Sequence, residues 1–127
     1  MRRHVASGSP YEQQIGFSRA VRHGHLIHVS GTAPIWPDGS CDPDPEVQAD
    51  RCFEIIGAAL GELGASLDHV VRTRMYVTDP AVAGAVGRAH ARAVGHVRPA
   101  ATMVVVAGLL DQRWRVEIEA DAVLPGQ

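Results

Sequence analysis

The sequence has few cysteines, no excess of basic charge and no long apolar run. Its two cysteines, Cys41 and Cys52, form no CxxC pair, so we expect free thiols in a reducing compartment and no disulfide framework. The net charge of -2 and the pI of about 6.4 give no reason to expect a nucleic-acid partner, because phosphate binding needs a clustered basic face. No segment is long and apolar enough to cross a membrane, and the N-terminal residues lack the apolar run of a signal peptide. These absences favour a cytoplasmic protein, and no pattern calls for a cofactor.

The length of 127 residues predicts a single domain over residues 1–127, large enough to fold around one core without a metal or disulfide. No internal repeat or linker interrupts it. We expect residues 1–14 to form a loose N-terminal segment, because the start is rich in Ser, Gly and Arg.

Two strands, Gly16 to Val21 and Leu26 to Ser30, are predicted to pair as a hairpin. The turn between them contains Gly24, for which a positive φ is easily reached. The segment from Pro34 to Pro45 carries four prolines and is predicted to be a loop. Three further strands are expected at Val71–Val77, Thr102–Ala107 and Trp114–Val123. In the first of these, alternation predicts a buried face made of Val71, Thr73, Met75 and Val77. In the last, alternation places Trp114, Val116, Ile118 and Ala120 on one face and Arg115, Glu117, Glu119 and Asp121 on the other.

Two helices are predicted from their capping residues. Asp44-Pro45 begins the first and Gly64 ends it, while Asp79-Pro80 begins the second and Gly95 ends it. Three- and four-residue spacing defines their apolar faces. These faces consist of Cys52, Phe53, Ile56, Ala59, Leu60 and Leu63 in the first helix, and Val82, Val86, His90 and Ala93 in the second.

This order of elements predicts an α+β fold. Two helices cannot cover both faces of a sheet this wide, so both should pack on one face. The opposite face is then partly apolar, and a closed oligomer is the simplest way to cover it.

At this point the sequence resembles the RidA/YjgF family, the reactive intermediate deaminases that are also labelled endoribonuclease L-PSP. The resemblance covers about residues 15–124, and its strength comes from six blocks in the family's order. These are Phe17–Val21, Val29–Pro34, Gly64–Val71, Tyr76–Asp79, Arg98–Ala100 and Val116–Ala120.

The resemblance implies a chorismate-mutase-like fold and a homotrimer with three equivalent clefts between subunits. It further implies hydrolysis of imines or enamines to ketones and ammonia in those clefts. Glu117 takes the place of the family's water-handling glutamate, and Gly31 that of its backbone contact to the ligand. A carboxylic acid can activate the water, and backbone donors can hold the ligand.

Several positions depart from the family pattern. Ala101 stands where the deaminases carry the arginine that binds the substrate carboxylate, and loss of such a contact costs about 1.5–3 kcal/mol. Phe17 replaces the usual tyrosine, Gly87 a common asparagine, and Met103 a small residue or cysteine. We therefore expect a more apolar cleft, whose substrate lacks the usual carboxylate or binds it through another arginine.

Arg19, Arg74 and Arg98 are the candidates for that arginine. Arg19 is preferred because its strand borders the cleft in the family, although surface pairing with the Glu119 face of the last strand is the simpler expectation for it. Glu117 also has an alternative without a functional role, because a charged strand residue between apolar neighbours is commonly a solvent-exposed surface residue.

The histidines give no metal site. His25 and His28 point to opposite faces of their strand and His23 lies in the turn, so the three cannot converge on one ion. His90 is expected to be a hydrogen-bonded core or interface residue, with a place in the cleft as the alternative. Ser30 lacks the Gly-x-Ser-x-Gly frame of a serine hydrolase.

The leading functional prediction is an imine or enamine hydrolase with Glu117 as its catalytic residue. Phe17, Arg19, Gly31, Gly87, His90, Ala101 and Met103 are predicted to contact the substrate. A metabolite-binding trimer without catalysis is the alternative. A ribonuclease, which the family's old label suggests, is disfavoured by the net acidity and by the lack of a basic, aromatic-rich stripe.

Overall fold

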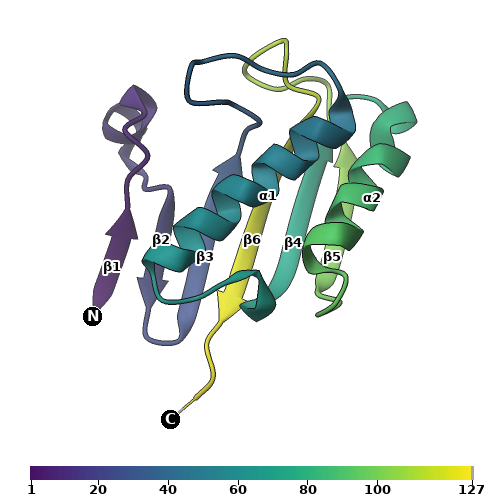
Figure 1. Ribbon diagram of the computed structural model, residues 1–127. Coiled ribbons are helices and arrows are strands. Elements are labelled where there is room, and N and C mark those ends of the chain that lie inside the picture. The colour runs from purple at the N-terminus through teal and green to yellow at the C-terminus, as the bar shows by residue number, and fades with distance from the viewer. Residues whose placement is uncertain (127) are drawn as a thin grey trace.

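The computed structural model describes residues 1–126. It contains one six-stranded sheet in the order β1-β2-β3-β6-β4-β5, with α1 and α2 side by side on the same face of it (Figure 1). β4 and β5 are parallel, and all other neighbouring strands are antiparallel. The strands are β1 (Arg2–Val5), β2 (Ala20–His23), β3 (Leu26–Thr32), β4 (Val70–Val77), β5 (Ala100–Val105) and β6 (Val116–Val123), and the helices are α1 (Pro45–Glu62) and α2 (Ala83–Val94). This confirms the predicted α+β class with both helices on one face.

The N-terminal segment differs from its prediction as a loose stretch. Residues Arg2–Val5 form β1 and pair with β2, and a π-helical turn, η1, follows at Glu12–Gly16. The buried Glu12 carboxylate accepts hydrogen bonds from the backbone N–H and the hydroxyl of Ser7. The strand forms because the edge of the β2–β3 hairpin offers unpaired backbone N–H and C=O groups. A segment of almost any sequence can form hydrogen bonds with these groups.

The β2–β3 hairpin is confirmed, with His23 opposite Leu26 and Gly24 at a φ of 64°. Its first strand begins at Ala20 and not at Gly16, because η1 occupies the preceding residues and ends at Gly16 with a φ of 90°.

α1 has the predicted caps. The Asp44 side chain accepts hydrogen bonds from the backbone N–H of Glu46 and Val47, at 2.8 and 3.3 Å, and Gly64 follows the helix at a φ of 84°. Its predicted apolar face is buried throughout: Cys52, Phe53, Ile56, Ala59, Leu60 and Leu63. The second helix begins with a 3-10 turn, η3 (Pro80–Val82), capped by Asp79.

β4 shows one error in the predicted alternation. Thr73, Met75 and Val77 are buried as expected, but Val71 is exposed and Val70 is buried instead. The register with β6 shifts between Val70 and Arg72, and a shift of one residue exchanges the two faces of a strand.

The face of the sheet away from the helices carries a polar network. His28 lies 2.7 Å from Asp121, which also accepts from Arg74 at 3.3 Å. The Tyr76 hydroxyl donates to Glu119 at 2.7 Å, and this hydrogen bond raises the pKa of the tyrosine. That this face is covered in an oligomer stays a prediction.

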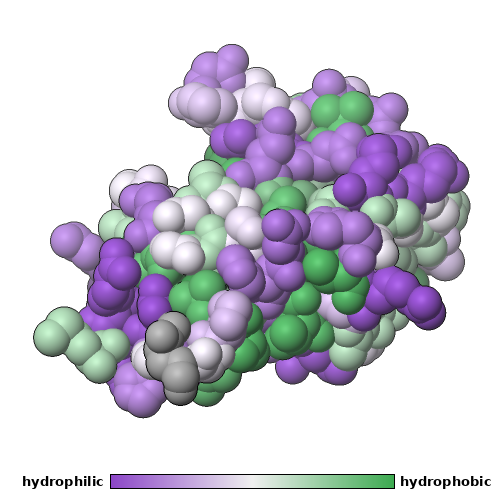
Figure 2. Space-filling model, turned by 60° about the horizontal axis from the view of Figure 1, so that its bottom comes forward, coloured by the Kyte–Doolittle hydropathy of each residue, from purple (hydrophilic) through white to green (hydrophobic). Residues whose placement is uncertain are grey.

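Apolar side chains are also exposed beside that network, namely Leu26, Val104 and Val123. Figure 2 shows the side near the C-terminus, where apolar patches are separated by polar side chains instead of merging into one area. Among the described residues, neither helix combines the length and the apolar character that crossing a bilayer requires.

Candidate functional site

A cavity of about 640 Å³ lies at one end of the sheet. Three segments distant in sequence meet there: the stretch around η1, the loop between β3 and α1, and the loop that precedes β6 (Figure 1). Most of its lining is apolar or aromatic. Among the residues that line it, only Arg19, Arg51 and Glu117 carry a charge.

Glu117 comes from β6, whose strict alternation buries Val116 and Ile118 under the helices and turns the glutamate to the opposite face. Burial raises the pKa of its carboxyl above the ordinary value of 4.5. Arg19 opposes this shift and Glu119 adds to it. A half-buried carboxylate with a raised pKa has the properties of a general acid or base.

Gly31 lies against Glu117 at an irregular point of β3, where the register with β6 shifts between Val29 and Thr32. A Cβ at residue 31 would overlap Oε2 of Glu117 and lie 3.3 Å from its Cδ. Only glycine therefore lets the carboxylate approach the backbone this closely. The structure thus brings together the two residues that the resemblance singled out.

Arg19 lies in the same cavity. Its Nη2 donates to the Gly31 carbonyl oxygen, while its Nε is buried and has no partner among the described residues. Burial lowers the pKa of the guanidinium, and the nearby carboxylates of Glu12 and Glu117 oppose that shift. Surface pairing with the Glu119 face was the simpler expectation. Arg19 lies near Glu117 of that face, but it is partly buried in the cavity and not on the surface. Within residues 1–126 Glu119 itself contacts Tyr76 and Arg74.

Phe17 is the fourth predicted residue that lines the cavity. Sequence reasoning missed Trp36 and Arg51, which also line it. Trp36 is in the predicted loop and Arg51 is next to the buried Cys52 on α1, so neither shows a pattern of its own. The one available signal was the position of Arg51, a charged residue at the border of the apolar face of α1.

Four predicted contact residues lie outside this cavity: Gly87, His90, Ala101 and Met103. Ala101 and Met103 are on β5, in register with Thr73 and Met75 of β4, and Gly87 is on α2 with open space around it. β4 separates β5 from β6, which carries Glu117. Within one chain these residues therefore do not line the cavity that holds Glu117.

His90 has the core role that was the simpler expectation for it. Its Nε2 forms a 2.7 Å hydrogen bond with Oγ1 of the buried Thr73, and its ring meets Phe53 edge-on at 5.7 Å. Burial lowers the pKa of the imidazole. The histidine is therefore already engaged between α2 and the sheet.

The remaining candidates lie elsewhere. Arg74 belongs to the polar network on the uncovered face, and the exposed Arg98 lies between α2 and β5 with a φ of 49°. The Ser30 hydroxyl donates to the Ser18 carbonyl at 2.6 Å. No three side chains of His, Cys, Asp or Glu within residues 1–126 are grouped so that they could hold a metal ion.

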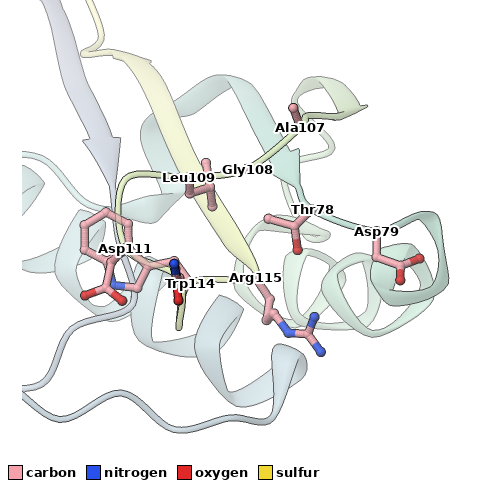
Figure 3. A pocket seen from close by; sticks show the side chains of 9 residues that line it. Thr78, Asp79, Ala107, Gly108, Leu109, Asp111, Trp114 and Arg115 are labelled. Atoms are coloured by element: carbon pink, nitrogen blue, oxygen red, sulfur yellow. The ribbon is translucent and has the colours of Figure 1, made fainter.

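A second hollow, of about 320 Å³, lies between the end of β4 and the loop before β6 (Figure 3). Its two carboxylates are already engaged. Asp79 caps η3 by accepting from the Ala81 N–H at 2.8 Å, and Arg113 binds Asp111 and lowers its pKa to about 2. Trp114 lines both hollows, but Phe17, Arg19, Gly31 and Glu117 line only the larger one.

Comparison with known proteins places these features in a family. A protein-family model described as Endoribonuclease L-PSP matches residues 9–124. A RutC family protein of Pyrococcus abyssi is 33% identical over 108 residues, which are 84% of this chain and 84% of that protein.

Solved structures agree with this result. The crystal structure of Rv2704 from Mycobacterium tuberculosis, described as a member of the YjgF/YER057c/UK114 family, is 44% identical with a TM-score of 0.90 and covers 98% of this chain and 100% of that one. RidA from an Antarctic Psychrobacter species is 25% identical with a TM-score of 0.81 and covers 95% and 94%. The chain therefore belongs to the endoribonuclease L-PSP family, that of the RidA and YjgF proteins.

Proposed function

We propose that this chain is a small-molecule hydrolase that acts on imines or enamines. The observation that carries the proposal is the Glu117 carboxylate, half-buried in a largely apolar cavity with a raised pKa and in contact with the backbone of Gly31. Such a group can take a proton from water at neutral pH and return it in a later step.

The reaction would proceed in two steps. The imine would react as its protonated form. In the first step the oxygen of a water molecule adds to the imine carbon, the C=N electron pair moves onto the nitrogen, and Glu117 accepts one of the water's protons, which gives a carbinolamine. In the second step Glu117 returns that proton to the nitrogen and the carbon–nitrogen bond breaks with its electron pair leaving on ammonia. The hydroxyl proton passes to Glu117, which leaves the ketone, and the glutamate then releases it to solvent. An enamine enters the same sequence after its carbon is protonated. Neither step needs an oxidant, a metal or a cofactor.

Arg19 would hold the backbone and carboxylate in place during this sequence. Its bond to the Gly31 carbonyl ties together the two sides of the site, and its charge opposes the upward shift of the Glu117 pKa. The glutamate then remains ionised often enough to act as a base.

The cleft would be completed by a second copy of the chain in a homotrimer. Gly87, Ala101 and Met103 lie on elements that cannot reach Glu117 within one chain. We infer that they contribute from the neighbouring subunit and make that wall apolar and uncharged. His90 is left out of the proposed contacts because its ring is engaged in the core. Free thiols at Cys41 and Cys52 fit a cytoplasmic location.

A deamination assay tests the proposal. Amino-acid oxidases would generate a panel of 2-imino acids in situ, neutral imines would be supplied in parallel, and ammonia and ketone release would be followed with and without the protein. Acceleration on either class supports the proposal. An unchanged rate on both classes contradicts it.

A metabolite-binding trimer without catalysis is the second candidate, and Ala101 is the observation that favours it. Without the arginine of the deaminases, the cleft could hold a ligand and orient it poorly for water attack. Saturable binding together with no product over the same panel is the result that would select this candidate. The net charge of -2 argues against a ribonuclease.

A further inference from the structure

The charges that line the cavity are not equivalent. Arg19 lies close to the carboxylates of Glu12 and Glu117, which balance its charge, and one of its donors is used by Gly31. Arg51, on α1, is the other cation of the lining, and its nearest carboxylate is Glu54 on its own helix. A ligand would therefore meet a compensated cation at Arg19 and a nearly uncompensated one at Arg51.

The contacts of Arg51 hold its guanidinium in place but leave its Nη2 without a hydrogen-bond partner among the described residues. Its Nε donates to the Ile35 carbonyl at 2.9 Å, and its Cζ lies 5.9 Å from the centre of the Trp36 ring. The Arg51 side chain is 22% exposed, whereas that of Glu54 is 66% exposed and only reaches Nη1 at 3.5 Å. So exposed an ion pair is weak, and Nη2 has no hydrogen-bond partner within residues 1–126.

We infer that Arg51 is the anion-binding residue of this cavity, and that the ligand is a monocarboxylate with an apolar or aromatic body. With Nε already bonded, the Nη1/Nη2 edge can receive a carboxylate end-on through two parallel hydrogen bonds, in which the ligand takes the place of the long 3.5 Å contact from Glu54 to Nη1. Stacking near Trp36 holds the guanidinium plane, so less side-chain freedom is lost on binding.

The rest of the lining selects the body of that ligand. Phe17, Ile55 and Leu110 add apolar surface next to Trp36 and Arg51, and the cavity of about 640 Å³ admits a side chain of aromatic size. A dianion is disfavoured because Arg51 is the one nearly uncompensated cation of the lining within the described chain.

This inference rests on the proposed function and deepens it by naming the substrate class of the same site. Under this inference the ligand carboxylate binds to α1 of the chain that supplies Glu117. It does not bind to β5 of the neighbouring subunit, where Ala101 offers no charge. Arg51 would thus bind the carboxylate that the arginine at the position of Ala101 binds in the deaminases.

Binding of two stable probes tests the inference without requiring turnover. Phenylpyruvate and phenylacetone share the benzyl ketone body, but only phenylpyruvate carries a carboxylate. Isothermal titration calorimetry would give both affinities for the wild type, R51M, R51K and the control R2M, which removes the same charge at an exposed site far from the cavity.

The wild type should bind phenylpyruvate at least about tenfold more tightly than phenylacetone, since one charge-assisted contact is worth roughly that factor or more. R51M should lose this preference and leave the phenylacetone affinity unchanged. R51K should keep part of it, because an ammonium retains the charge but not the fork. R2M should behave as the wild type.

A wild type without the preference overturns the inference, and so does an R51M protein that retains it. Loss of the preference in R19M but not in R51M would assign the role to Arg19 and also overturn it. If R51M does not fold, R51K provides the test: a partly reduced preference for phenylpyruvate supports the inference, and an unchanged preference overturns it. Ammonia release is measured separately, so that the two proposals can fail independently. Binding that depends on Arg51 but is accompanied by no ammonia release would contradict the proposed hydrolase and not the Arg51 assignment. Ammonia release by the wild type, together with an R51M protein that still prefers phenylpyruvate, would contradict the Arg51 assignment and not the hydrolase.

Discussion

The close approach of the Glu117 carboxylate to Gly31 gives a prediction that separates catalysis from folding. In Gly31→Ala the added methyl group would overlap Oε2 of Glu117. The atom that must yield is the end of a flexible side chain, so the glutamate can turn aside. Moving a side chain away from its preferred rotamer costs about 0.5–1.5 kcal/mol, which corresponds to a fall in Tm of roughly 2–8 °C for a chain of this size. The fold should therefore survive.

The activity of Gly31→Ala should not survive in the same way. General acid–base catalysis contributes roughly 100- to 10,000-fold and requires the group within hydrogen-bond reach of its proton. We expect kcat/KM for imine hydrolysis to fall at least about 100-fold, measured by ammonia release beside thermal denaturation. Gly61→Ala is the matched control, because nothing lies near a Cβ there; it should leave activity unchanged and stabilise α1 slightly. Wild-type turnover in Gly31→Ala would refute the reasoning, as would outright unfolding.

Three further predictions concern stability. The raised pKa of Glu117 means that the folded state holds its proton more tightly than the unfolded state, so this contribution is present at low pH and lost as pH rises from 4.5 to the folded pKa. Glu117→Gln should therefore gain stability over the wild type on going from pH 4 to pH 7 in urea titrations, and a loss over that range would contradict the shift. The lowered pKa of His90 acts in the opposite direction, because the folded state holds this proton less tightly than the unfolded state, so the wild type should lose stability as pH falls below 6.5. His90→Gln should lose less stability over that range and should keep its turnover. An equal loss of stability, or a loss of turnover, would show that the histidine has another role. The fully buried Gln48 bonds the backbone of Arg113 and Arg115, so Gln48→Ala should cost about 2–4 kcal/mol in urea denaturation, and a cost below about 1 kcal/mol would contradict this account.

Local signals predicted much of the fold. Asp44 and Gly64 bound α1 because capping depends on a few adjacent residues. The alternation of β6 identified its two faces, and with them the orientation of Glu117. These features depend on neighbours in sequence, which a single sequence displays directly.

What the sequence did not predict depends on distant groups. β1 forms through backbone pairing with β2, which leaves no side-chain pattern. Val71 is exposed because of a register shift that no local signal marks. The bond from Arg19 to the Gly31 carbonyl arises from the irregular course of β3, and could not be inferred from either residue alone.

The cavity itself was predicted only in part. The resemblance identified Phe17, Gly31 and Glu117, since these lie in blocks that match the family. Arg51 and Trp36 come from a helix and a loop whose approach is set by packing of α1 on the sheet. Their pairing is therefore a property of the tertiary structure.

The most direct test of the central claim is ammonia release by the wild type and Glu117→Gln, side by side, on the same in situ imine. The amide keeps the size of the carboxyl and its hydrogen-bonding capacity but cannot accept the proton of water. The account predicts acceleration by the wild type and a rate for Glu117→Gln close to that without protein, with both proteins folded and in the same oligomeric state. Equal acceleration by the two proteins would contradict it.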